Sequence, residues 1–176
     1  MKKLLIPFFI LGTVTMIIVM GKTGKPLKTI STPAGILNLE FAYSKEKVDS
    51  VFKGWQINMS SSKIDTAKTN TYWDFLFIFF YSGLLFLSSR KLSGIYRDGT
   101  GFNKAGKIIA KLALAAGVLD IIENICMLQS LGGNVTDGFA ITATICASVK
   151  FTFALIAVMY VFISLPLSAY AKFRNG

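Results

Sequence analysis

Residues 112–131, LALAAGVLDIIENICMLQSL, and residues 139–158, FAITATICASVKFTFALIAV, decide the fold of this chain. Each stretch is about as long as the ~20 apolar residues that an α-helix needs to cross a bilayer. Each also carries ionisable side chains near its middle, Asp120 and Glu123 in the first and Lys150 in the second. A charge at that depth costs on the order of 3 kcal/mol and persists where it is paired or lines a cavity. The two stretches therefore predict neighbouring membrane helices whose polar groups face each other.

Two more apolar runs accompany this pair, and the four together make up half of a chain of 176 residues that is 53% hydrophobic. The four runs cover residues 4–20, 72–89, 108–131 and 139–167. We predict an all-α fold, a four-helix transmembrane bundle that forms one membrane domain over residues 1–176. Residues 21–71 form a partly helical extracytoplasmic loop between the first two helices.

The composition also excludes several classes of function. The net charge of +10 comes from Lys and Arg at segment ends and in connections, so it does not indicate a nucleic-acid partner. The chain has no His, which argues against haem, His-ligated zinc and a Ser-His-Asp triad. We expect no metal and no cofactor.

The first apolar run has the basic start of a signal peptide, Lys2 and Lys3. It exceeds the usual length of such a peptide's apolar region, and no small-residue cleavage site follows it. We therefore interpret residues 4–20 as an uncleaved first helix.

The distribution of Lys and Arg predicts the orientation. The connection between the second and third helices is short and strongly basic, whereas residues 129–138 contain no Lys or Arg. The positive-inside rule then places the basic connection and both termini in the cytoplasm and the 21–71 loop outside, in a bacterial inner membrane. The 21–71 loop is itself rich in Lys, which weighs against this orientation, but at lower density.

The outer loop contains two segments with structural patterns. Thr32-Pro33 is a possible helix start, while the alternation of Leu37, Leu39 and Phe41 would also suit a short strand. Residues 45–55 predict an amphipathic helix that lies on the membrane surface or acts as a lid over the bundle mouth. Residues 59–71 are polar and predict a flexible connection.

Small residues mark the inner faces of the third and fourth helices, where they let backbones approach closely. In the third helix the stripe comprises Ala113, Ala116, Gly117, Asp120, Glu123, Asn124 and Met127. In the fourth it comprises Ala143, Cys146, Ala147, Lys150, Ala154, Ala157 and Val161. Cys126 and Cys146 lie at similar depth, and we interpret them as structural thiols although a disulfide is conceivable.

The predicted ligand site lies where these stripes meet. Equal offsets from the connecting turn place Asp120 and Lys150 at the same depth, and the lean of helical side chains favours a Lys150–Glu123 contact at least equally. Carboxylates outnumber the single ammonium, so a proton, a cation or a cationic ligand is needed for balance. The candidate residues are Asp120, Glu123, Asn124 and Lys150, with Asp74 and Tyr81 nearer the outside and Glu40 at the outer mouth.

Three interpretations of these residues remain open. The leading one is a membrane protein that binds a small amphiphile, a lipid headgroup or a cation, or serves as an accessory subunit. The second is a membrane enzyme that uses Asp120, Glu123 and Lys150 on a lipid-like substrate. The third is a structural subunit of a membrane complex, in which the polar groups fix the register of the helices.

Two short motifs carry a resemblance. The T-P-x-G-I motif at Thr32–Ile36, followed by Glu40, and the L-D-x-x-E-N motif at Leu119–Asn124 are similar to a group of small bacterial four-helix membrane proteins of unknown function. The resemblance implies a multi-pass bacterial membrane protein. It implies no ligand and no catalytic role for any residue.

Overall fold

The computed structural model describes residues 4–56 and 63–174, and the side chains only as far as residue 167. The described residues are all-helical and contain no strand, so the predicted all-α class is confirmed. The elements are α1 (Leu5–Gly24), the short 3-10 helix η1 (Lys25–Leu27), α2 (Leu37–Glu40), α3 (Lys45–Gln56), α4 (Lys63–Ser93), α5 (Gly101–Leu131) and α6 (Asp137–Arg174).

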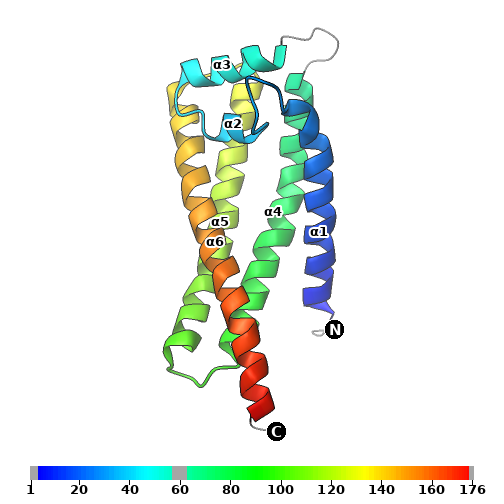
Figure 1. Cartoon of the computed structure of the whole chain (residues 1–176). Coiled ribbons are helices and arrows are strands. Elements are labelled where there is room, and N and C mark those ends of the chain that lie inside the picture. The colour runs from blue at the N-terminus through cyan, green and yellow to red at the C-terminus, as the bar shows by residue number, and fades with distance from the viewer. Residues whose placement is uncertain (1–3, 57–62, 175–176) are drawn as a thin grey trace.

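The four long helices run side by side and give the molecule two distinct ends (Figure 1). At one end α3 lies across the bundle with α2 beneath it, and we call this the capped end. At the opposite end lies the connection between α4 and α5, residues 94–100, and we call this the turn end. The helix α1 begins at the turn end and α6 ends there.

Three helical segments are long and apolar enough to cross a membrane: Leu5–Leu27, Lys63–Ser93 and Asp137–Leu167. They indicate a membrane protein by their length and composition. The helix α5 is not among them, although it has the same 31-residue length as α4. Its sequence is interrupted by Lys111, Asp120 and Glu123.

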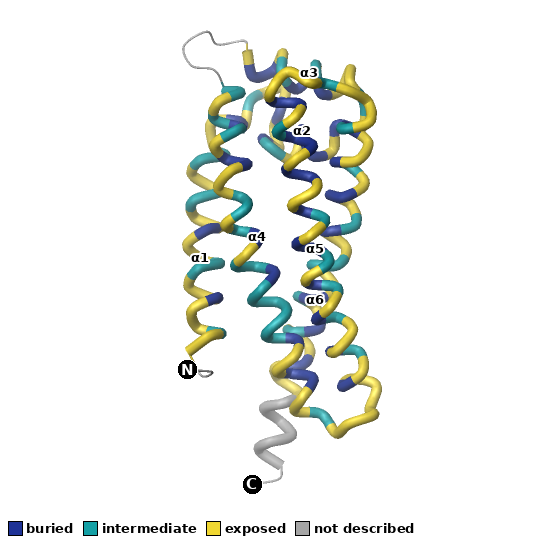
Figure 2. Tube along the Cα trace, turned by 180° about the vertical axis from the view of Figure 1, so that it is seen from behind, coloured by how far each residue is buried: buried dark blue, intermediate teal, exposed yellow. Residues whose placement is uncertain are grey.

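The helix α5 packs against α4 and α6, and the predicted face of small and polar residues is buried between them. Every member of its stripe is buried, including Asp120 and Glu123 (Figure 2). The opposite face exposes large apolar side chains, among them Val118, which is 57% exposed. Because Gly117 has no side chain, Ser82 of α4 can pack directly against the α5 backbone.

The helix α1 is held mainly by aromatic contacts with α4. The rings of Phe8 and Phe9 lie 5.3–6.0 Å from those of Phe79 and Phe80. A Cβ at Gly12 would collide with the Phe80 ring, so the helix approach depends on this glycine. Among the described residues, α1 buries just Phe9 and Met16. It therefore packs on one side of the bundle rather than in its centre.

The capped end has its own small apolar core, and the predicted amphipathic helix at 45–55 is confirmed as α3. Its residues Val48, Val51 and Trp55 are buried. The Trp55 indole N–H donates a hydrogen bond to the carbonyl of Leu27 at 3.0 Å. The backbone N–H of Lys45 donates to Asp137 Oδ1 at 2.7 Å. We call α2 and α3 together the cap. These two bonds connect the cap to η1, which follows α1, and to the first turn of α6.

The predicted start of the second helix, residue 72, is wrong. The helix α4 begins at Lys63 because its polar first turns pack on neighbouring elements instead of remaining in water. The Asn70 amide, for example, donates to Thr23 Oγ1 at 2.7 Å. Residues 63–71, predicted to be flexible, are thus helical, whereas residues 57–62 lie outside the described part of the chain.

The third helix also begins earlier than predicted, at Gly101 instead of 108, with Thr100 as an N-cap that accepts a hydrogen bond from the Asn103 N–H. Thr32 does not cap a helix, since its hydroxyl donates to the Leu27 carbonyl at 2.9 Å and the next α-helix starts at Leu37. The alternative of a strand at 37–43 is also wrong.

The end of the last helix differs as well. The helix α6 continues through Pro166 to Arg174, beyond the predicted end at 167. Pro166 removes one backbone hydrogen bond but does not end the helix. Lys2 and Lys3 lie outside the described residues.

Candidate functional site

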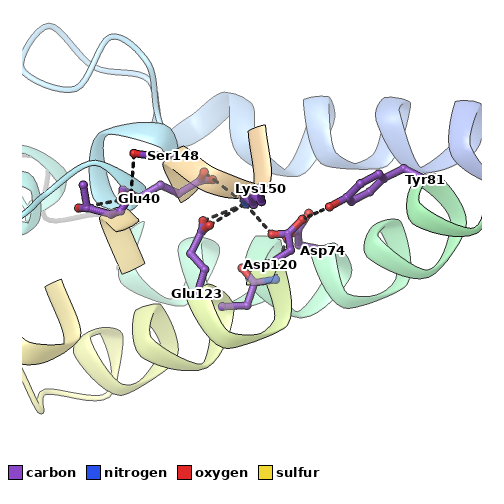
Figure 3. Close-up of polar contacts among 9 residues, drawn as sticks. Glu40, Asp74, Tyr81, Asp120, Glu123, Ser148 and Lys150 are labelled. Carbon is purple, nitrogen blue, oxygen red and sulfur yellow. Dashed lines mark hydrogen bonds and ion pairs between the residues drawn. The ribbon is translucent and has the colours of Figure 1, made fainter. Parts of the chain in front are cut away.

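Lys150 is the centre of a cluster of charged side chains in the capped half of the bundle. Its Nζ donates hydrogen bonds to Asp120 Oδ1 at 2.5 Å and to Glu123 Oε1 at 2.9 Å (Figure 3). The predicted Lys150–Glu123 contact is therefore present together with the contact to Asp120. Lys150 is 6% exposed, Asp120 4% and Glu123 0%, so these ion pairs are shielded from solvent.

The helix α4 supplies two more members of the cluster. The Tyr81 hydroxyl donates to Asp120 Oδ2 at 2.7 Å, so both oxygens of Asp120 are hydrogen-bonded. The Asn124 amide donates to Asp74 Oδ2 at 2.7 Å. The polar groups of α4, α5 and α6 thus form two hydrogen-bonded sets, one around Lys150 and one between Asn124 and Asp74.

Glu40 reaches the same cluster from the cap. Its Oε2 lies 3.6 Å from Lys150 Nζ, and the side chain is 10% exposed. The Thr144 hydroxyl of α6 donates to the Glu40 backbone carbonyl at 3.1 Å and so fixes the end of α2 against α6. Burial raises the pKa of the Glu40 carboxyl, and the nearby Lys150 ammonium offsets part of this rise.

The cluster is rich in acceptors and poor in donors. Four carboxylates, those of Glu40, Asp74, Asp120 and Glu123, surround the single ammonium of Lys150. Among the described residues, Oε2 of Glu40 and Oε2 of Glu123 accept no hydrogen bond, although both lie within ion-pair distance of Lys150 Nζ. Buried acceptors without a donor are costly, so the site is suited to a ligand that brings hydrogen-bond donors or positive charge.

The cluster lies at one end of an apolar cavity of about 480 Å³. Glu40, Asp74, Tyr81, Asp120 and Lys150 line its polar end. The rest of its wall is mainly apolar and comes from α1, α2, α4 and α6: Thr13, Met20, Ile36, Leu37, Phe77, Leu84, Leu85, Phe151, Ala154 and Val158. Ligand sites commonly combine an apolar wall with a few polar groups in this way.

A second cavity of about 570 Å³ continues the first toward the turn end. The two share Leu84, Leu85 and Val158, and the second extends to Ser88 and Lys91. We call the joined space the groove. It lies between α1 and α6, which make no extensive contact with each other over the described residues. From Asp74 to Lys91 the groove follows α4 for about 26 Å, at 1.5 Å per residue.

The sequence identified the charged residues but not the apolar wall. All seven candidate residues lie in or beside the cluster, with Glu123 and Asn124 behind the cavity lining. Phe77 and Phe151 were missed, because an aromatic residue in a membrane helix is ordinary and gives no signal by itself. Their spacing from the charged residues could have indicated them. Phe77 lies three residues after Asp74 and four before Tyr81 on α4, and Phe151 follows Lys150.

The remaining candidate chemistry is limited. Within residues 4–56 and 63–174, no group of His, Cys, Asp or Glu is arranged to hold a metal ion. Cys126 and Cys146 are both free and buried, in keeping with the interpretation as structural thiols.

Comparison of the sequence with protein-family models gave no match, and comparisons with curated proteins and with solved structures gave none either. The resemblance to small bacterial four-helix membrane proteins stays a prediction. The function therefore has to be argued from the geometry of the cluster and the groove.

Proposed function

We propose that this chain is a multi-pass membrane protein that binds an amphiphile, with the polar head at the charge cluster and the apolar tail in the groove. The observation that carries the proposal is the position of the cluster at the end of an apolar cavity of about 480 Å³. A cluster that served the fold alone would need no adjoining space, because packed side chains would fill it.

The burial pattern supports a fourth membrane span formed by α5. Its ionisable residues Asp120 and Glu123 face the bundle interior. Its outer face is apolar from Leu114 to Ile125 and, toward the turn end, also carries Ile108 and the exposed Lys111. From Ile108 to Ile125 this face is about 26 Å long at 1.5 Å per residue, close to the ~30 Å hydrocarbon thickness. Lipid would therefore contact a mainly apolar face, and the long Lys111 side chain can extend toward the membrane surface at the turn end.

The orientation remains as the sequence predicts it. We place the basic turn end in the cytoplasm and the capped end outside, in a bacterial inner membrane. The cluster then lies in the outer half of the bilayer, beneath the cap, and the groove extends toward the cytoplasmic side between α1 and α6. An amphiphile would enter from the lipid phase between these two helices.

Binding is favoured over catalysis by the contacts of Lys150. Its ammonium is engaged by Asp120 and Glu123 and faces Glu40, which is the arrangement of an ion-pair network. A lysine that acts as a base or nucleophile needs an unpaired amine directed at a substrate. A role as accessory subunit is compatible with the binding function.

The test is to purify the protein in a mild detergent and identify bound amphiphiles by mass spectrometry. Ala154→Trp places a large ring in the cavity, so we expect the amount of bound amphiphile to fall at least severalfold. Leu155→Trp is the matched control, because Leu155 is the next residue on α6 and is 62% exposed. Equal amounts of bound amphiphile in the two variants would contradict the proposal.

A second comparison separates binding from folding. Lys150→Met alone leaves buried carboxylates without their partner and should destabilise the bundle. Combining it with Glu123→Gln removes one of these charges, so folding should partly recover while binding stays lost. If the double variant binds the same amphiphile with unchanged affinity, the cluster is not its head site.

A further inference from the structure

We infer that the amphiphile carries a primary ammonium head, which binds between Glu40 and Asp74 while its chain lies in the groove between α1 and α6. This inference rests on the proposed function and assigns the chemical class of the ligand.

The first reason is the unused hydrogen-bonding capacity of Glu40. This side chain lines the cavity, its residue is 8% exposed, and its Oε2 accepts no hydrogen bond within the described residues. Lys150 Nζ is 3.6 Å away and donates instead to Asp120 and Glu123. An ammonium N–H on the cavity side would supply the missing donor, and hydrogen bonds between charged groups are the strong ones.

The second reason is the charge balance of the cavity. Four carboxylates accompany one ammonium, and among the described residues no further Lys or Arg lines the cavity of about 480 Å³. Lys150 pairs with Glu40, Asp120 and Glu123, whereas Asp74 accepts its hydrogen bond from the neutral Asn124 amide. A cationic head would reduce the excess of negative charge, whereas a phosphate or carboxylate head would increase it.

The third reason is the aromatic lining at the same end of the cavity. Phe77 and Tyr81 have ring centroids 5.1 Å apart, and both line the cavity together with Phe151. Lys150 Nζ already lies 5.0 Å from the Phe151 ring centroid, which shows that a cation fits beside this ring. Aromatic faces attract ammonium groups, and their apolar surface also contacts the methylenes next to the ammonium favourably.

A metal ion fits this site less well than an ammonium. The described residues contain no group of side chains arranged to hold a metal ion. The groove beyond the cluster also requires an apolar tail, because Leu84, Leu85 and Val158 continue the wall toward the turn end.

The test compares four twelve-carbon chains that differ in their heads: dodecylammonium, dodecyltrimethylammonium, dodecanol and dodecanoate. Each is titrated by calorimetry into the full chain in phosphatidylcholine nanodiscs, with the signal of empty nanodiscs subtracted. We expect dodecylammonium to bind most tightly, on the order of tenfold more tightly than dodecanol, with dodecanoate weakest. Dodecyltrimethylammonium should fall between the first two, because it has the charge but no N–H.

Variants connect the preference to the named carboxylates. Glu40→Gln and Asp74→Asn should each reduce the ratio of ammonium to alcohol affinity severalfold, while dodecanol binding changes little. Glu46→Gln is the control, because it removes the same charge from an exposed position on α3. Thermal unfolding of each variant shows whether the fold is kept, and the use of two independent carboxylates means that one misfolded variant does not end the test.

The possible failures are distinguishable. If dodecanol or dodecanoate binds as tightly as dodecylammonium, the ammonium assignment is overturned and the proposed function survives. If Glu46→Gln changes the preference as much as Glu40→Gln, the preference reflects the overall charge of the protein, and the assignment is again overturned. If none of the four chains binds above the empty nanodiscs, both the assignment and the proposed function are contradicted.

Discussion

The two ends of the bundle use the same kind of interaction in opposite surroundings. At the capped end, Lys150 and its carboxylates are buried, and the Lys150 and Asp120 side chains are 7% and 5% exposed. At the turn end, Lys107 pairs with Asp98 at 3.1 Å, but these side chains are 46% and 90% exposed. A buried pair constrains the structure because breaking it strands a charge, whereas an exposed pair is replaced by water at little cost. The buried pairs therefore hold the helices together at the capped end, whereas the exposed pair contributes little to stability at the turn end.

The largest effect should come from removing the centre of the buried cluster. Lys150→Met should lower the free energy of unfolding by about 3–5 kcal/mol, because it leaves buried carboxylates unpaired. Unfolding in detergent micelles, followed by circular dichroism, measures the change. Lys107→Met removes the corresponding lysine at the turn end as the control. Similar losses in the two variants would remove the contrast between the ends.

The next largest effect concerns the tyrosines of the two ends. Tyr81→Phe removes a hydrogen bond to the charged Asp120 and should cost about 1.5–3 kcal/mol. Tyr96→Phe removes a 3.1 Å bond from its hydroxyl to the neutral carbonyl of Ser164 and should cost about 0.5–1.5 kcal/mol. The same unfolding experiment compares the loss of stability in the two variants. A larger loss of stability for Tyr96→Phe would show that the charge on Asp120 does not strengthen its hydrogen bond with Tyr81.

A smaller effect is expected within the cap. Trp55→Phe removes the N–H that binds the Leu27 carbonyl and should cost about 1 kcal/mol. Because this bond joins α3 to the end of α1, amide hydrogen exchange should accelerate in α3 more than in α5. Trp73→Phe, at a residue 44% exposed, should leave the exchange of α3 unchanged. Uniform acceleration across the bundle would mean that the cap is not a separate unit.

The smallest effect should come from the exposed pair itself. Asp98→Asn should change the free energy of unfolding by less than about 1 kcal/mol, and added salt should reduce this difference from wild type because it screens exposed charges. Unfolding of the wild type and the variant in low and in high salt measures the free-energy change and its dependence on salt. If Asp98→Asn lowers the free energy of unfolding as much as Tyr81→Phe does, the fold of the turn end also depends on its ion pair.

The sequence predicted the long apolar helices from the length of the apolar runs, and it predicted the polar face of α5 from a periodic pattern. A stripe of Ala, Gly, Asp, Glu and Asn at spacings of three and four is unambiguous once a helix is accepted. Glu40 was harder to place, since nothing in a loop sequence states how deep its side chain reaches. It was named as a candidate at the outer mouth, and its 3.6 Å approach to Lys150 depends on how α2 packs against α6.

The helix ends and the groove could not be read from the sequence for physical reasons. Hydropathy reports where a helix leaves an apolar environment, not where it stops, so the polar first turns of α4 were assigned to a loop. The groove exists because α1 packs on α4 through Phe9 and Phe80 and not on α6, a choice between partners that one helix sequence does not encode. Cavity-lining residues such as Val158 therefore look like any other apolar residue.

The contact between Lys150 and the α5 carboxylates has a consequence for biosynthesis. The chain is synthesised from its N-terminus to its C-terminus, so Asp120 and Glu123 are made before Lys150, their partner on α6. Until then α5 carries two charges without compensation, and it is the one long helix that fails the criteria for a membrane span. For the fourth span that we propose for α5, this geometry favours insertion of α5 and α6 together as a helical hairpin, in which Lys150 of the later helix supplies the positive charge for the carboxylates of the earlier one.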